Sequence, residues 1–285
     1  MPLSEFLTTH ENPFTKEKQR TLDWAGLAAF SDPVTWFAPM SQPAKDVPLS
    51  RLGGRPVMAP DTPWPTASSG PMTFAAQVDF AELTKLGRTD GPSCPDNGVL
   101  ELFVDVENLG LGFPTEGWKV LYVVDARGER PHPSGSHELP VTPLRFGWVR
   151  GKAPNRRALV ESIRAGTFIA PTRDEEPAPD HRVLGPPDWL DDRYDGFFVD
   201  PRVELVLGDQ GLKAEKKALE KAEKRGLDVV ATVRQAREWI VLWQLESDER
   251  SGLCWGDCGT LYLLVRRSDL AAHRFDQVRC VVQSS

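Results

Sequence analysis

The sequence predicts an α+β fold in which largely antiparallel sheets from two pseudo-equivalent halves pack into one domain, with short peripheral helices. The first observation is composition: 25 prolines in 285 residues favour short elements joined by stiff loops, because proline fixes φ and lacks an amide donor. The second is a series of short segments rich in β-branched and aromatic residues. The third is an internal repeat of three sequence patterns in one order.

Each half carries, in the same order, Arg-x-x-Gly-x-Pro, a glutamine followed by an apolar and an acidic residue, and Gly-x-Leu-x-Leu-x-Val. The copies lie at 51–56 and 182–187, at 77–79 and 244–246, and at 98–104 and 259–265. A duplicated unit would supply two small sheets, each with an apolar face that must be buried against another layer. The alternative is coincidence among common strand patterns, which alternation alone can produce.

We expect a single domain over residues 1–285. Its parts are an N-terminal helical extension (about 1–47), a first half (about 48–150) and a second half (about 178–285) with a helical insertion (near 208–230). In the extension, a helix is predicted over 15–30, with Thr15 as its cap and an apolar stripe behind it. The insertion is predicted from the Ala-, Leu-, Glu- and Lys-rich tract at 213–225, which Gly226 would end.

The remaining elements follow from local composition. Strands are expected at 74–80, 98–106, 118–124, 199–207, 239–245, 260–266 and 278–283, and short helices at 156–165 and 268–272. Proline, glycine and polar residues predict loops over 33–70, 126–143 and 171–196, with short extended pieces in the first of these. The predicted architecture is therefore many short strands with long connections.

Charge and targeting signals exclude several classes of protein. A net charge of −7 argues against a nucleic-acid-binding protein, which needs a basic surface to displace phosphate counterions. The start of the chain lacks the apolar core of a secretory signal, and no run of 18 apolar residues predicts a membrane span. Four sparse cysteines without a signal are typical of reduced thiols. We therefore expect a cytoplasmic protein with no nucleic-acid or membrane partner.

Several motifs together resemble a known family. They are the tract Ser50–Pro56, the Trp64-Pro65 pair, the strand around Gln77, and Trp255-Gly-Asp-Cys-Gly259 before a strand. Over about residues 48–285, the chain resembles the YwqG-like family, a bacterial domain family of unknown function. The resemblance implies an α+β fold and a cytosolic bacterial protein, and it brings no established reaction and no agreed catalytic residues.

Four candidate ligand-binding residues come from the repeat. Arg51 and Arg182 are pseudo-equivalent guanidinium groups that could bind a carboxylate or phosphate, or form internal ion pairs. Gln77 and Gln244 are mid-strand amides that could hold a polar ligand in a shared cleft, or tie backbone groups of the Gly-Pro turns together. The sequence alone leaves both alternatives open for each pair.

Asp257 is the fifth candidate. It lies between Gly256 and Cys258 just before a strand, where a carboxylate could meet a ligand or act as a general acid or base. The alternative is that it caps neighbouring amides, as aspartate commonly does in turns. Asp257 is also a candidate for a catalytic residue, and the sequence indicates no other.

Metal and cofactor motifs are incomplete. Cys254 and Cys258 lack the paired Cys-x-x-Cys spacing of a zinc site, and the acidic run at 188–200 lacks the pattern of a calcium loop. The tract Gly147–Lys152 is one residue short of a phosphate-binding loop, and no Gly-x-Ser-x-Gly motif occurs. We therefore predict no metal and no cofactor.

These observations favour a cytosolic binding or interaction protein with a cleft between its halves. The expected partner is a small polar ligand or another protein, and Gly/Pro-rich loops suit recognition. One alternative is a hydrolase or transferase that uses Asp257 as general acid or base. A second is a toxin-neutralising, immunity-type partner with an acidic face that captures a basic protein. The sequence does not decide whether the protein is an enzyme.

Overall fold

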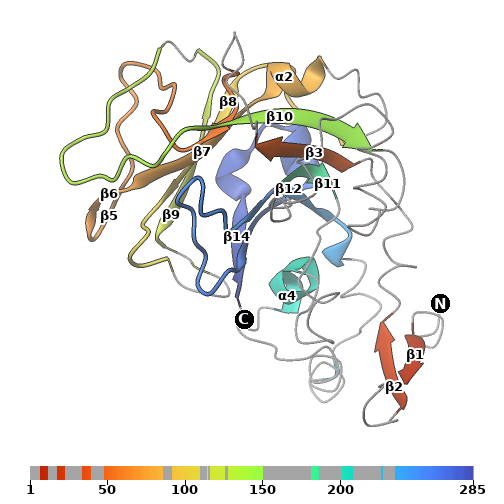
Figure 1. The fold of residues 1–285 in the computed structure, drawn as a ribbon. Helices are drawn as coiled ribbons and strands as arrows, with labels where there is room; N and C mark the ends of the chain where they lie inside the picture. The colour runs from red at the N-terminus through yellow and green to blue at the C-terminus, as the bar shows by residue number, and fades with distance from the viewer. Residues whose placement is uncertain are drawn as a thin grey trace, which may run out of the picture.

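The structure is a computed structural model, and it describes residues 7–11, 18–22, 34–39, 48–85, 92–109, 114, 116–125, 128–149, 181–185, 201–207, 226 and 235–284. Its main feature is a ten-stranded antiparallel sheet (Figure 1). In spatial order the strands are β14 (Arg279–Gln283), β13 (Thr260–Arg266), β12 (Trp239–Glu246), β11 (His181–Gly185), β3 (Val34–Pro39), β10 (Thr142–Val149), β4 (Arg51–Leu52), β7 (Thr73–Asp79), β8 (Val99–Val104) and β9 (Trp118–Val123).

The remaining elements are small. The strands β1 (Leu7–Glu11) and β2 (Lys18–Leu22) form a separate two-stranded sheet beside the main one, and β5 (Thr66–Ala67) pairs with β6 (Gly70–Pro71). The helices are α2 (Phe80–Thr84), α4 (Pro201–Leu207), α7 (Arg267–Ala271) and the 3₁₀ turn η4 (Phe275–Gln277). The fold is therefore mainly β, and the predicted antiparallel sheets with short helices are confirmed. No helix within the described residues is long and apolar enough to cross a membrane.

The order of strands is symmetric about a central pair. On one side of β3 and β10 lie β4, β7, β8 and β9, which we call the first-half strands. On the other side lie β11, β12, β13 and β14, the second-half strands. Each set is a run of antiparallel neighbours that begins with a short strand next to the central pair. The two sets thus have the same topology.

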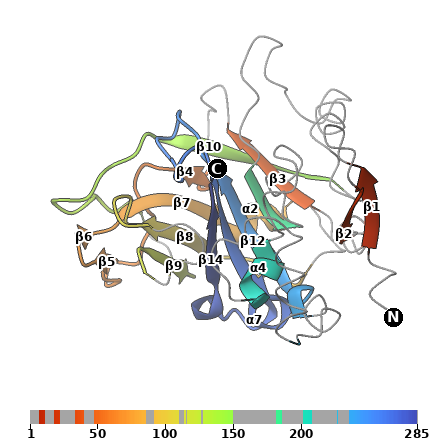
Figure 2. The ribbon, with the colours of Figure 1, turned by 90° about the horizontal axis from the view of Figure 1, so that it is seen from below.

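One apolar cluster takes residues from both sets of strands, and Figure 2 shows the first-half strands β7, β8 and β9 lying beside the second-half strands β12 and β14. It contains Leu100 and Leu102 from β8 and Leu261 and Leu263 from β13, all fully or almost fully buried. Because successive side chains of a strand point to opposite faces, these residues define the inner face of each half. We call this cluster the inner core, and its burial is the main apolar contact between the halves.

The outer faces carry separate clusters. On the first half this is Met58, Met72, Phe74 and Phe103, against which Trp64 packs. On the second half it is Trp239, Val241, Tyr262, Leu264 and Val281, covered by Leu205 and Val206 of α4. Each half therefore has two buried faces, which explains why β7 and β12 are buried along their whole length.

Two predictions for secondary structure are wrong. The helix expected over 15–30 is contradicted by β2, which pairs along its whole length with β1, because strand pairing overrides a weak helix propensity. The strand expected over 199–207 is the helix α4 instead. Pro201 takes the first helical position, where its missing amide costs no hydrogen bond, and the apolar residues that suggested a strand cover the second outer cluster.

Four strands of the sheet, β3, β4, β10 and β11, match no predicted strand, although β3 and β4 fall in the tract 33–70, where short extended pieces were expected. β3, β10 and β11 contain proline, glycine or charged residues, and each pairs with neighbours on both sides, so tertiary pairing supplies what propensity lacks. The strands predicted at 74–80, 98–106, 118–124, 239–245, 260–266 and 278–283 and the helix at 268–272 are confirmed with small shifts of their ends. The helices predicted at 156–165 and 213–225 lie outside the described residues.

Candidate functional site

The repeated Arg-x-x-Gly-x-Pro pattern forms a tight turn in the first half. Gly53 and Gly54 have φ of 60° and 71°, in the left-handed region that favours glycine. A Cβ on Gly53 would lie 2.2 Å from the carbonyl oxygen of Pro140, so the backbones pack directly together. The Gly54 amide also donates to the carbonyl of Leu139 at 2.9 Å. The two glycines therefore let the segment before β10 approach the turn after β4.

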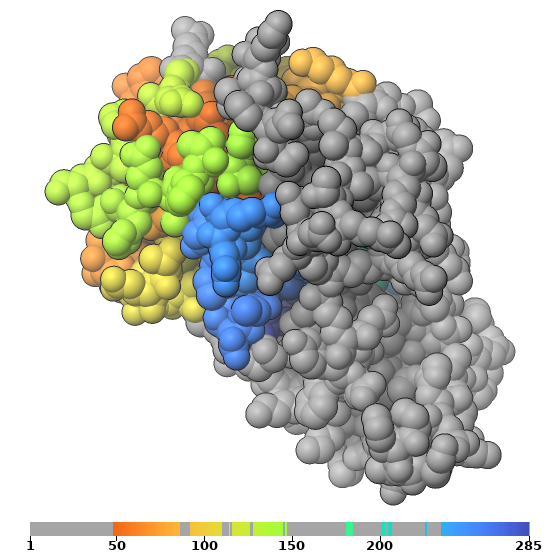
Figure 3. Space-filling view, in the orientation of Figure 1, coloured from red at the N-terminus to blue at the C-terminus, as the bar shows by residue number. Residues whose placement is uncertain are grey.

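The same segment reaches the second half. A Cβ on Gly252, in the turn between β12 and β13, would lie 3.3 Å from Cδ2 of Leu139. Figure 3 shows the loop before β10, in green, lying against this turn, in blue. The loop thus joins the Gly53-Gly54 turn of one half to the β12–β13 turn of the other.

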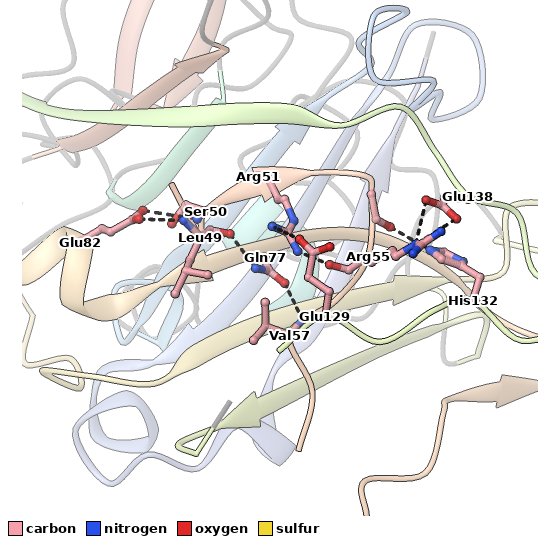
Figure 4. Close-up of polar contacts among 11 residues, drawn as sticks. Leu49, Ser50, Arg51, Arg55, Val57, Gln77, Glu82, Glu129, His132 and Glu138 are labelled. Atoms are coloured by element: carbon pink, nitrogen blue, oxygen red, sulfur yellow. Dashed lines mark hydrogen bonds and ion pairs between the residues drawn. The ribbon is translucent and has the colours of Figure 1, made fainter. Parts of the chain in front are cut away.

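Gln77 joins two stretches of backbone across β7. It is fully buried, and its Oε1 accepts a hydrogen bond from the amide of Val57 at 3.1 Å while its Nε2 donates to the carbonyl of Leu49 at 2.6 Å (Figure 4). Both polar atoms of the side chain are therefore used by the protein itself. This arrangement holds the chain on both sides of β4 against the outer face of β7.

Arg51 lies beside Gln77 and reaches from the interior to the surface. It opposes Gln77 in the register of β4 and β7, and its Nη1 forms an ion pair of 3.0 Å with Glu129. The Arg51 side chain is 5% exposed and that of Glu129 is 55% exposed. The second Nη atom donates to the carbonyl of Arg55. Burial lowers the pKa of Arg51, and the charge of Glu129 opposes that shift.

Within the described residues, the Nε of Arg51 is buried without a hydrogen-bond partner. The two Nη atoms of the guanidinium group thus have partners, whereas the Nε atom has none within the described residues. Because a buried donor left unpaired costs free energy, this N–H is a point where an added acceptor would stabilise the protein.

Glu101 completes the row and is the residue that sequence reasoning missed. It opposes Gln77 in the register of β7 and β8, and its exposed fraction is 0%. Neither carboxylate oxygen has a hydrogen-bond partner among the described residues. Desolvation by burial raises the pKa of Glu101 to about 8, and the nearby charge of Arg51 limits the rise. We call Arg51, Gln77 and Glu101 the polar row.

Two loop segments cover the polar row. We define the cover as residues 53–58 and 128–139. They are joined by a backbone bridge between Val57 and Glu129, by a hydrogen bond of 2.9 Å from the Arg130 amide to the carbonyl of Pro56, and by a contact of 2.8 Å between Nε2 of His132 and the carbonyl of Gly54. The ion pair of Arg55 with Glu138, at 3.2 Å, adds an exposed contact.

The second half contains the matching row without the acid. Arg182 opposes Gln244 in the register of β11 and β12, and Gln244 opposes Tyr262 in that of β12 and β13. All three residues are at most 1% exposed. Tyr262 therefore holds the position that Glu101 holds in the first half, and it packs in the second outer cluster.

The two rows lie on opposite outer faces, with the inner core between them. The structure brings Arg51 together with Gln77, and Arg182 together with Gln244, and it does not bring the four into one cleft. The glutamines follow the alternation of their strands, which places them on the face opposite the inner-core leucines.

Asp257 lies apart from both rows, in the exposed turn before β13. Its backbone amide donates to Oγ of Ser284 at 2.7 Å. The turn is closed by a hydrogen bond of 2.8 Å from the Gly259 amide to the carbonyl of Trp255. A Cβ on Gly259 would lie 2.2 Å from the carbonyl oxygen of Gln283, so the glycine allows the turn to pack on the end of β14. The packing of this turn therefore explains the last glycine of the Trp-Gly-Asp-x-Gly motif.

A buried histidine–aspartate pair anchors the same turn region and was also missed. Nε2 of His181 lies 3.7 Å from Oδ2 of Asp248, and both side chains are at most 2% exposed. Nδ1 of His181 faces the amide of Glu246 at 3.2 Å. Burial would raise the pKa of Asp248, but the nearby imidazole of His181 and the hydrogen bonds from Arg250 outweigh it and lower the pKa to about 2. The pair ties β11 to the turn that follows β12.

Possible metal ligands are spread out over the described chain. No three histidine, cysteine, aspartate or glutamate side chains in that part of the chain gather closely enough to hold an ion. Cys254 and Cys258 are both exposed in the turn before β13. The acidic run at 188–200 lies outside the described residues.

The comparisons with known proteins place the chain in a family. No curated protein matches the sequence. A family profile described as a domain of unknown function, DUF1963, matches residues 50–284. The match begins at the residue before Arg51 and ends beyond β14, so it includes all first-half and second-half strands. Because it covers most of the chain, the protein belongs to the DUF1963 family, a domain family of unknown function.

Proposed function

We propose that this protein is a binding protein whose ligand site is the polar row of the first half, beneath the cover. The observation that carries the proposal is the carboxylate of Glu101, which is fully buried and has no hydrogen-bond partner within the described chain. A buried carboxyl group normally has partners, because its desolvation otherwise costs several kilocalories per mole. A ligand with hydrogen-bond donors would offset that cost.

The second half supports this proposal as an internal comparison. If the two sets of strands descend from one duplicated unit, the row of Arg182, Gln244 and Tyr262 reveals what the scaffold itself requires. An arginine and a glutamine recur at matching positions, whereas the acid occurs in the first half alone. We therefore interpret the arginine and glutamine as parts of the scaffold and Glu101 as the residue with a further role. This interpretation replaces the expected cleft between the halves by a site on one half.

The experiment is a thermal-shift screen of a small-molecule library against the full chain and its Glu101→Gln variant. Glutamine keeps the shape of glutamate and removes the charge. The proposal expects at least one compound that raises Tm of the natural chain and has little effect on the variant. Glu138→Gln is the matched control, since Glu138 is an exposed acid of the cover.

A library in which every stabilising compound acts equally on the natural chain and on Glu101→Gln would refute the proposal. Assignment to the YwqG-like family, a bacterial and cytoplasmic origin, catalysis by Asp257 and a toxin-neutralising role remain predictions from the sequence. The exposed position of the Asp257 turn is compatible with contact to another molecule, but no further observation singles it out.

A further inference from the structure

The polar atoms left over in the row define the ligand they would accept. Both polar atoms of Gln77 are used, and the two Nη atoms of Arg51 bind Glu129 and the Arg55 carbonyl. What remains is the carboxyl group of Glu101, which offers two acceptor oxygens once it is ionised, and one N–H donor on Arg51. A complementary ligand therefore carries several donors at one point and an acceptor beside them.

The charges favour a cationic donor. Arg51 is already paired with Glu129, so Glu101 is the ionisable group of the row without an ion-pair partner in the described residues. A cation that displaces the proton of Glu101 would be attracted by the carboxylates of Glu101 and Glu129, whereas an anionic ligand would gain nothing from either. A hydrogen bond between a cationic donor and a carboxylate is also stronger than one between neutral groups.

Burial limits the size of the group that enters. Glu101 is completely covered, while the Arg51–Glu129 pair joins the row to the surface at an exposed side chain. A narrow group that displaces the cover near Glu129 would meet Arg51, and the register of β4, β7 and β8 places Glu101 on the far side of Gln77. A primary ammonium group has three N–H donors on one small atom and fits this requirement better than a planar or branched cation.

Resting on the proposed function, we infer that the ligand is a primary amine that places its ammonium group on Glu101 and a neighbouring hydroxyl or carbonyl oxygen on Nε of Arg51. The ligand class is thus small amino alcohols and amino amides. The shared requirement is a primary ammonium group with an oxygen acceptor a few bonds away.

The test uses matched pairs of amines whose nitrogen carries either three hydrogens or three methyl groups. Ethanolamine is compared with choline, and glycinamide with its N-trimethyl analogue, by isothermal titration calorimetry at millimolar concentration against the full chain. Within each pair the positive charge and the oxygen acceptor are kept, but the trimethylated nitrogen has no N–H to donate and is bulkier. We expect binding of a primary amine, binding of its partner weakened about tenfold or more, and a similar loss in Glu101→Gln.

A second readout follows from the proton on Glu101. With a pKa of about 8 the free carboxyl is mostly neutral at pH 7, so binding a cation releases about 0.9 proton per molecule. The binding enthalpy measured in two buffers of different ionisation enthalpy reports this number without any variant. Arg51 is the charged group that acts on this pKa, and Arg51 is itself paired with Glu129.

Three results overturn the inference: equal binding of the trimethyl partners, amine binding that persists unchanged in Glu101→Gln, or no binding by any of the four compounds. If library compounds of another class still depend on Glu101, the site stands and its ligand class is different. If no compound depends on Glu101, the proposed function fails as well.

Discussion

Gln77 and Gln244 occupy the same position in their strands, each directly opposite an arginine of the neighbouring short strand. Each strand also has a β-bulge at the same distance from its glutamine. The bulge lies between Phe74 and Ala76 in β7 and between Val241 and Trp243 in β12. The arginines are Arg51 and Arg182. A sequence repeat that keeps its register and its bulges supports the proposed duplication more strongly than the pattern of letters does.

The first prediction concerns Gln77. Replacing it by leucine would leave the Val57 amide and the Leu49 carbonyl without their side-chain partner. We expect the free energy of unfolding to fall by about 2–4 kcal/mol, because each unpaired buried group costs about 1–3 kcal/mol. Urea unfolding measures the change. Gln277→Leu, at a partly exposed position on η4, serves as the control and is expected to change stability by less than about 0.5 kcal/mol.

The second prediction concerns the pH dependence that Glu101 imposes. Its pKa is raised from 4.5 to about 8 in the folded chain, so between these values the native state holds a proton that the unfolded state has released. The stability contributed by this group is therefore complete below pH 4.5 and decreases as pH rises, by up to about 1.4 kcal/mol per pH unit.

The Glu101→Gln variant removes that loss. Its stability relative to the natural chain is expected to grow between pH 5 and pH 8, as measured by urea unfolding at several pH values, with Glu138→Gln as the control. A constant difference between the Glu101→Gln variant and the natural chain across this range would mean that the carboxyl group titrates normally.

The third prediction concerns Asp248, whose pKa is lowered from 3.8 to about 2. A depressed pKa means that the carboxylate stabilises the folded chain above pH 3.8 and that this contribution is lost as pH falls toward 2. Asp248→Asn is expected to lose about 1–3 kcal/mol at pH 7, because the charged partner of His181 and Arg250 is gone. The difference from the natural chain should shrink in acid, as measured by urea unfolding at pH 7 and pH 3.

The fourth prediction concerns the cysteines. Cys254 and Cys258 are exposed, whereas Cys280 is buried and its burial raises the pKa of the thiol. The thiolate is the form that reacts with a maleimide. The reagent should therefore modify Cys254 and Cys258 in the native protein, and Cys280 only once the protein is unfolded. Peptide mass spectrometry identifies the labelled positions. Rapid native labelling of Cys280 would show that β14 opens readily.

The sequence predicts the outer strands of the sheet well and its centre poorly. β7, β8, β12 and β13 consist mostly of apolar and aromatic residues, so their composition identifies them as strands. The central strands β3, β10 and β11 carry mixed sequences and form because neighbours on both sides supply hydrogen bonds. Long-range pairing of this kind leaves little trace in local composition.

The candidate site shows the same division. Arg51 and Gln77 were identified because they recur, but the repeat could not reveal which side of the strands they face. Glu101 was missed because an acid within Gly-x-Leu-x-Leu-x-Val reads as one exposed position of a half-buried strand. The signal that could have found it is the comparison with Tyr262, since an aromatic residue at the matching place predicts burial.

The family match begins at residue 50, whereas β3 lies at Val34–Pro39 between β10 and β11. The strand that bridges the two halves of the sheet thus comes from outside the shared region. A truncated chain starting at residue 50 would leave β10 and β11 with bare edges that face one another across a missing strand. The unpaired backbone groups of such edges can form hydrogen bonds with the strands of other molecules. A fragment that starts at residue 50 is therefore expected to aggregate under conditions in which the longer chain does not.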